Sequence, residues 1–140
     1  MTGSSEVTDA RERVSANTAY RAGVAVALVT SLLTVWTTVV RDDGSGMSYF
    51  MLVMAAVVGA FAAWFRPAGM ARTMVGVAVM QLLLGVAVAT APVTAILPNG
   101  ALKALLLSGV FAALWLTSGA CFRAASRRKA VAPFLRSPAD

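Results

Sequence analysis

The side chain with the clearest chemical potential in this sequence is Gln81. It lies within Thr73 to Leu102, a stretch of thirty residues without one ionisable side chain. Eight residues past Thr73, a helix has risen about 12 Å, which places the amide near the middle of a membrane span. An unpaired amide in hydrocarbon is costly, so Gln81 must have a hydrogen-bond partner.

Hydroxyl side chains at similar depth are the candidates for that partner. The candidate intramembrane polar cluster comprises Gln81, Thr30, Ser31, Thr34 and Thr90. Such a cluster could line a small polar site or pore for a neutral solute. The alternative, which we favour, is interhelical hydrogen bonding of roughly 1 kcal/mol that fixes the packing.

Other chemistry is limited by what the chain lacks. There is no histidine, and Cys121 is the only cysteine, so intramolecular disulfides, Cys/His zinc sites and imidazole bases are excluded. We therefore expect no catalytic residue, no metal site and no cofactor, and the protein is predicted not to be an enzyme. Proton relays and ion-coupled pumps use ionisable residues at depth, and no apolar run here contains one.

The composition predicts an integral membrane protein. Of the 140 residues 59% are hydrophobic and only 13% are charged, and the mean hydropathy is +0.76. A soluble domain of this size could not cover its surface with polar groups. The net charge is +6, and the lysine and arginine residues that produce it flank the apolar runs. Their position indicates membrane topology and not nucleic-acid binding.

The pattern of apolar runs predicts an all-α fold, an integral membrane bundle of four transmembrane helices. The expected spans are about 20–40, 47–65, 72–96 and 101–122, within a transmembrane domain of residues 19–122. Residues 1–18 are predicted to be a flexible cytoplasmic tail and residues 123–140 a basic cytoplasmic tail.

Three turns are expected between the spans, at residues 41–46, 66–69 and 98–100, where glycine, proline or asparagine is present. Pro92 should kink the third span and leave the carbonyl of Val88 without its usual donor, with Thr90 or Thr94 in compensation. Asn99 is a candidate cap for the fourth helix.

The distribution of lysine and arginine between the two sides predicts how the protein is oriented in the membrane. With the amino terminus in the cytoplasm, ten of them lie inside and two, Arg41 and Lys103, lie outside. This bias places both termini in the cytoplasm, as in a multi-pass protein of the bacterial inner membrane. The inner residues are Arg11, Arg13, Arg21, Arg66, Arg72, Arg123, Arg127, Arg128, Lys129 and Arg136.

A weak internal repeat suggests two duplicated helical hairpins. Residues 23–26 recur as 76–79, and residues 59–63 are similar to 109–113. Chance matches are common in a chain rich in Gly, Ala and Val, and the sequence leaves both explanations open.

Small residues recur four apart and predict close helix packing, within the chain or against a partner. The helix-packing candidates are Gly23, Ala27, Gly59, Ala63, Gly85, Gly109 and Ala113. A second group, Arg123, Arg127, Arg128 and Lys129, could bind anionic lipid headgroups, although a role in fixing orientation is sufficient to explain it.

In size and span number the chain is similar to the small multidrug resistance transporters, but it lacks the glutamate that this family uses in its first helix. In hydropathy and length the whole chain resembles small, uncharacterised four-helix inner-membrane proteins of bacteria, and this resemblance implies no activity. We expect a non-catalytic accessory or oligomerising subunit, a homo-oligomer or part of a larger membrane complex, in contact with the lipid bilayer. The alternative is a small channel or facilitator for a neutral solute, with a polar site around Gln81.

Overall fold

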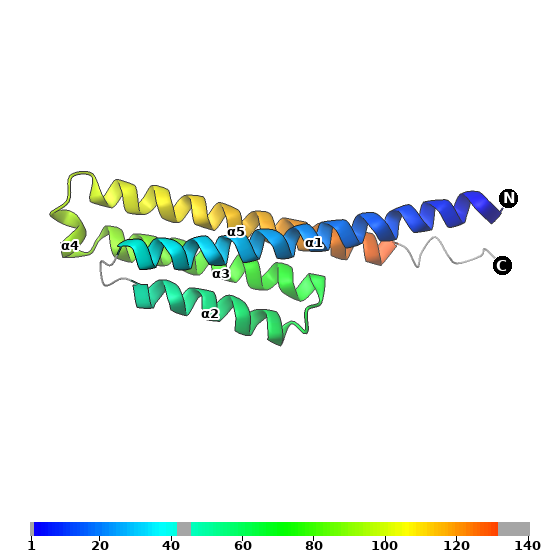
Figure 1. Cartoon of the computed structure of the whole chain (residues 1–140), viewed down its shortest axis with the longest axis horizontal. Helices are drawn as coiled ribbons and strands as arrows, with labels where there is room; N and C mark the ends of the chain where they lie inside the picture. Colours follow the sequence, from blue (N-terminus) through cyan, green and yellow to red (C-terminus); the bar gives the residue numbers. More distant parts are fainter. Residues whose placement is uncertain (1, 42–45, 132–140) are drawn as a thin grey trace.

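The computed structural model describes residues 2–41 and 46–131, and all regular structure in these two ranges is helical. The predicted all-α class is therefore confirmed. Figure 1 shows the helices, which are α1 (Thr2–Arg41), α2 (Gly46–Ala62), α3 (Pro67–Ala89), α4 (Pro92–Ala95) and α5 (Gly100–Val131).

Three of these helices are long and apolar enough to cross a membrane: Gly3–Val40, Pro67–Ala89 and Gly100–Ala130. The apolar part of α2, Met47–Ala62, is shorter. A helix of 17 residues rises about 25 Å, somewhat less than the hydrocarbon thickness of about 30 Å. Of the four expected spans, three thus correspond to helices long and apolar enough to cross a membrane, and α2 is shorter.

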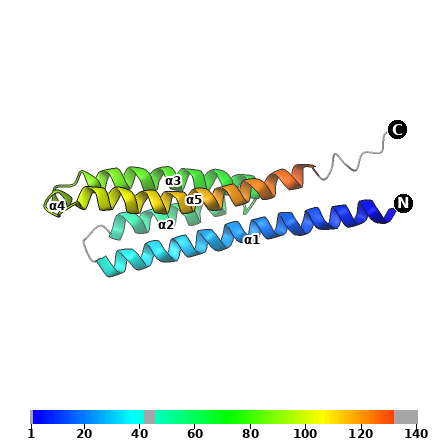
Figure 2. The same ribbon diagram turned by 90° about the horizontal axis from the view of Figure 1, so that it is seen from above.

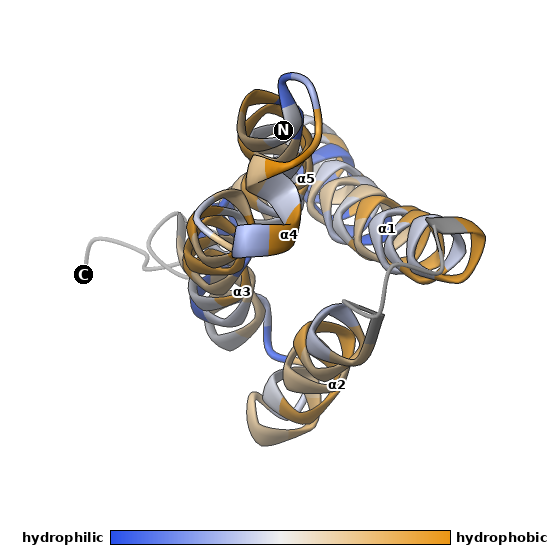
Figure 3. Ribbon diagram, turned by 90° about the vertical axis from the view of Figure 1, so that its left-hand side faces the viewer, coloured by the Kyte–Doolittle hydropathy of each residue, from blue (hydrophilic) through white to orange (hydrophobic). Residues whose placement is uncertain are grey.

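The successive helices α1, α2, α3 and α5 alternate in direction and lie side by side, so that α1 and α3 run the same way (Figures 1 and 2). Helix α5 packs most extensively on α3 and next on α1, whereas α2 has smaller interfaces with α3 and α1. Viewed end-on, α2 lies to one side of the other three (Figure 3). The core is formed by Leu52 of α2, Met74 and Val77 of α3, and Trp115 and Phe122 of α5.

Helices α1 and α5 continue well beyond the apolar runs. The segment expected to be a tail, residues 1–18, is helical from Thr2, and α5 extends to Val131 instead of ending near Phe122. In these extensions Glu12 of α1 and Arg127 of α5 line one groove, and Ala16 of α1 and Ala125 of α5 are buried. Residues 132–140 of the predicted basic tail lie outside the described residues.

The turn between α2 and α3 begins earlier than expected, because α2 ends at Ala62 and not at residue 65. Trp64 and Phe65 both have left-handed backbone angles, with φ of 49° and 54°. The N–H of Phe65 donates to the carbonyl of Ala60 at 3.2 Å, and the Tyr20 hydroxyl donates to the Phe65 carbonyl at 3.0 Å. The chain reversal is therefore held by α1. The turn predicted after Arg41 lies largely outside the described residues.

Pro92 ends the third helix instead of kinking it. Helix α3 stops at Ala89, and Pro92 occupies the first turn of the short helix α4. The Thr94 hydroxyl donates to the Val88 carbonyl at 2.6 Å, which confirms the predicted compensation. Asn99, the candidate cap, adopts φ 57°, and its backbone carbonyl accepts the Lys103 N–H at 3.0 Å.

Two glycine pairs of the internal repeat lie in different environments. A methyl group on Gly23 would lie 3.1 Å from the Phe122 ring, whereas one on its counterpart Gly76 would meet nothing within 4 Å. Gly59 is packed against Thr73, but its counterpart Gly109 is open. In each pair the glycine of the first proposed hairpin is closely packed and its counterpart in the second is open.

Candidate functional site

Gln81 of α3 and Ser108 of α5 form the central polar contact of the molecule. Only 1% of Gln81 and 2% of Ser108 is exposed. The Gln81 side-chain Nε2 donates to Ser108 Oγ at 3.2 Å, and Ser108 Oγ donates to the Gln81 backbone carbonyl at 2.9 Å. The two residues thus join the helices by reciprocal hydrogen bonds, as the cost of a buried amide requires.

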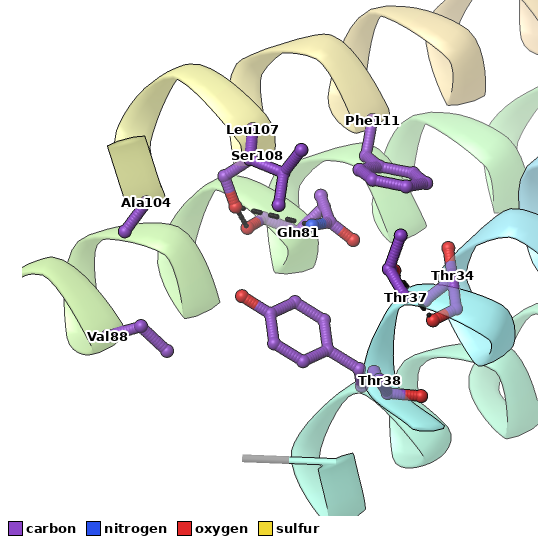
Figure 4. Close-up of a pocket in the computed structure, with 10 residues that line it drawn as sticks. Thr34, Thr37, Thr38, Gln81, Val88, Ala104, Leu107, Ser108 and Phe111 are labelled. Carbon is purple, nitrogen blue, oxygen red and sulfur yellow. Dashed lines mark hydrogen bonds between the residues drawn. The ribbon is translucent and has the colours of Figure 1, made fainter. Parts of the chain in front are cut away.

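A cavity of about 30 Å³ lies beside this pair, between α1, α2, α3 and α5 (Figure 4). Its polar lining includes Thr34 and Thr37 of α1 in addition to Gln81 and Ser108. The full lining is Thr34, Thr37, Thr38, Tyr49, Gln81, Val88, Ala104, Leu107, Ser108 and Phe111.

The predicted polar cluster is only partly brought together. Gln81 and Thr34 line the same cavity, but Thr30 and Ser31 do not. Thr30 is fully buried and donates to Val26 of its own helix at 2.7 Å, while Ser31 donates to Ala27.

Thr90 lies outside this cluster, because it is exposed and its hydroxyl donates to Val86 at 2.9 Å within α3. The predicted grouping of Thr30, Ser31 and Thr90 around Gln81 is therefore corrected. All three hydroxyls are satisfied by carbonyls of their own helices, which removes any need for a partner on another helix.

Ser108, Thr37, Thr38 and Tyr49 were not predicted as site residues. Ser108 could have been found from the sequence, because it is a lone hydroxyl in the apolar run between Lys103 and Thr117. Nothing in the sequence marks the other three, because they line the cavity only as a result of how α1 and α2 are oriented about their own axes in the bundle.

Two further polar groups are buried in α5. The Ser118 hydroxyl donates to the Gly23 carbonyl of α1 at 2.8 Å. The indole N–H of Trp115, a residue with no exposed surface, has no hydrogen-bond partner among the residues that the structure describes.

The helix-packing candidates fall into two groups. Methyl groups on Gly59 and Gly85 would overlap the side chains of Thr73 and Ser108, and Gly23 is close to Phe122. Ala27 and Ala63 pack against the core. In contrast, Gly109 has open space beside it and Ala113 is exposed, so no other described helix packs closely on this pair.

The four predicted headgroup-binding residues are in the C-terminal part of α5, at the end of the molecule where α1 and α5 extend past α2 and α3 (Figure 1). Arg123, Arg127 and Arg128 line one shallow groove. Arg123 also lines a second groove with Arg72 of α3, where the apolar side chains include Val75 and Leu116. Lys129 lies in the last turn of α5. Arg72 was predicted only as a topology signal.

The described residues offer no obvious centre for covalent or metal chemistry. Within residues 2–41 and 46–131, no group of three or more His, Cys, Asp or Glu side chains gathers. Cys121 is half-buried. The structure contains a small polar cavity, a buried hydrogen-bonded pair, and a basic end formed by Arg72, Arg123, Arg127, Arg128 and Lys129.

These features define an all-α protein with three helices that are apolar and long enough to cross a membrane. No family model, curated protein or solved structure matches the chain.

Proposed function

We propose that this protein is a non-catalytic subunit of a bacterial inner-membrane assembly, with four spans, both termini in the cytoplasm and an accessory or oligomerising role. Large apolar side chains are exposed along α1, α2, α3 and α5, as expected of surfaces that contact lipid or other helices. The positive charge is concentrated at one end of the molecule, where the cytoplasmic side would be.

The observation that carries the oligomerising role is the outward position of Gly109 and Ala113. The other predicted small-residue pairs are filled by side chains of this chain, whereas Gly109 and Ala113 remain open on α5. Thr117, one turn further, is also exposed. Without a hydrophobic drive between helices in lipid, small residues on an outer face allow a second helix to approach closely.

Native mass measurement of the protein in mild detergent tests this role. We expect the wild-type protein to form oligomers or to retain partner proteins, and Gly109→Leu to weaken that association because a large side chain separates the helices. Gly76→Leu is the matched control, since Gly76 is also open but lies on α3. A strictly monomeric wild-type protein without partners would contradict the proposal, as would equal effects of the two substitutions.

The proposed crossing of α2 has its own test. In a Cys121→Ala background, Ser45→Cys should react with a membrane-impermeant thiol reagent only from outside and Ala68→Cys only from inside. If both cysteines react from the same side, α2 does not cross and the four-span topology fails.

Anionic lipid is the partner proposed for the basic end. Arg72 and Arg123 line one groove with Val75 and Leu116, so a headgroup phosphate could meet the guanidinium groups while an acyl chain lies along the apolar part. Native mass spectra should show retained anionic lipid. Arg72→Gln combined with Arg123→Gln should reduce it more than Arg11→Gln combined with Arg13→Gln.

The second candidate function is a facilitator for a neutral solute, and the polar cavity beside Gln81 favours it. At about 30 Å³ the cavity restricts such a solute to the size of water. The permeability of liposomes to such a solute, measured with wild-type protein and with Gln81→Leu, tests this function. Equal permeability with the two proteins would rule out a facilitator that uses the Gln81 cavity.

A further inference from the structure

The orientation of the Gln81 amide is fixed by its neighbour. The Ser108 hydroxyl has one proton, and it donates that proton to the Gln81 backbone carbonyl at 2.9 Å, a group that can only accept. Ser108 Oγ can therefore only accept from the Gln81 side chain, so the atom facing it must be the amide nitrogen. The amide oxygen, Oε1, points away from Ser108 and has no hydrogen-bond donor within residues 2–41 and 46–131.

The threonines of the cavity cannot supply that donor. Thr34 donates its proton to the Thr30 carbonyl at 2.8 Å, and Thr37 donates to the Leu33 carbonyl at 2.9 Å. Thr38 likewise donates to the Val35 carbonyl at 2.7 Å. Each hydroxyl keeps free lone pairs but has no proton left, so these groups offer the cavity acceptors only.

Since Gln81 Oε1 accepts no hydrogen bond from any described residue, Tyr49 of the lining included, and the threonine oxygens are acceptors, the cavity suits a guest that donates hydrogen bonds. Its volume of about 30 Å³ exceeds the roughly 10 to 15 Å³ that one water needs. None of its ten lining residues is ionisable at neutral pH, so nothing there would compensate the desolvation of a cation. The guest is thus small, neutral and rich in donors.

We infer that this cavity is a binding site for one or two ordered water molecules, one of which donates to Gln81 Oε1. The nearby threonine oxygens accept the remaining protons, which would give each water the several polar partners that buried waters have. Bound water would explain how an amide oxygen with almost no exposed surface persists without a protein donor. The inference holds whether or not the protein is a subunit of a larger assembly.

Gln81 is the only glutamine in the chain, which makes a direct test possible. Protein labelled with ¹⁵N in the glutamine side chain and placed in lipid nanodiscs should show one pair of amide proton signals. We expect these protons to give rotating-frame cross-peaks to water, because a bound water lies beside the amide. A wild-type protein whose folded-state signals give no such cross-peak would overturn the inference.

Two variants separate bound water from other sources of the signal. Ser108→Ala removes the adjacent hydroxyl proton, which could relay exchange with bulk water. In folded protein whose glutamine amide signals keep the wild-type shifts, so that the amide has not turned, the cross-peak should persist, and its loss would overturn the inference. Ala104→Val adds volume to the lining and should reduce the cross-peak, whereas Ala101→Val, at an exposed position of the same helix, should not. Equal cross-peaks in these two folded variants would place the water elsewhere.

Discussion

The Ser118 hydroxyl of α5 donates to the backbone carbonyl of Gly23 in α1 at 2.8 Å, across 95 positions of the sequence. This contact depends on the missing side chain of Gly23, because a methyl group there would lie 3.1 Å from the ring of Phe122. Ser118 and Phe122 are one turn apart and face the same point of α1. The glycine therefore sets how closely α1 approaches α5.

Ser118→Ala should lower the free energy of unfolding by about 0.5 to 1 kcal/mol, the usual value of an interhelical hydrogen bond in a membrane protein. Unfolding by SDS titration in micelles, followed by circular dichroism, measures the change. Thr117→Ala is the control, since the Thr117 hydroxyl is exposed and donates to Ala113 of its own helix. Equal losses in the two variants would show that the contact with Gly23 contributes nothing specific.

Gly85→Ala should destabilise the fold by about 1 to 3 kcal/mol, as overpacking in a closely packed interior does. The added methyl group would overlap the Cβ and Oγ of Ser108, and so it would also disturb the hydrogen bonds to Gln81.

Gly76→Ala tests whether this effect is one of packing. Gly76 lies in the same helix with open space beside it, so alanine there should leave stability unchanged or raise it by up to about 1 kcal/mol. The same titration compares the variants, and a comparable loss in both would contradict the close approach of α3 and α5 at Gly85.

Trp64→Asn should stabilise the turn between α2 and α3. Trp64 has φ 49° and is 83% exposed, so its bulky side chain occupies a left-handed conformation with little packing in return. Asparagine tolerates that conformation, and relief of about 1 kcal/mol is expected. Trp36→Asn controls for the loss of an exposed tryptophan, because Trp36 lies in regular helix. A thermal midpoint that falls equally in both variants would refute the strain at Trp64.

Trp115 should behave as an interior fluorophore, since it has no exposed surface whereas Trp36 is 66% exposed. In a variant with Trp36→Phe and Trp64→Phe, emission should be shifted to short wavelength and resist both acrylamide and brominated lipid. A variant that retains only Trp36 should be quenched by the lipid. Similar lipid quenching of Trp115 would mean that α5 does not pack as described.

The compensation at Pro92 illustrates what can be predicted locally. Loss of the proline N–H frees the Val88 carbonyl, so the sequence alone predicts compensation by a nearby hydroxyl, Thr90 or Thr94, and the structure selects Thr94. The same is true of the helices themselves and of the need to pair Gln81, because these follow from composition, chain geometry and the cost of burying a polar group.

The identity of the partner of Gln81 is different, because it depends on how each helix is rotated about its own axis. Ser108 faces Gln81 and Thr90 does not, although all three are polar residues in apolar surroundings. In the same way Gly85 is enclosed and Gly109 is open. The sequence by itself determined that the chain is helical, apolar and in need of internal hydrogen bonds; only the packing of helices against one another decided which side chains meet and which face outwards.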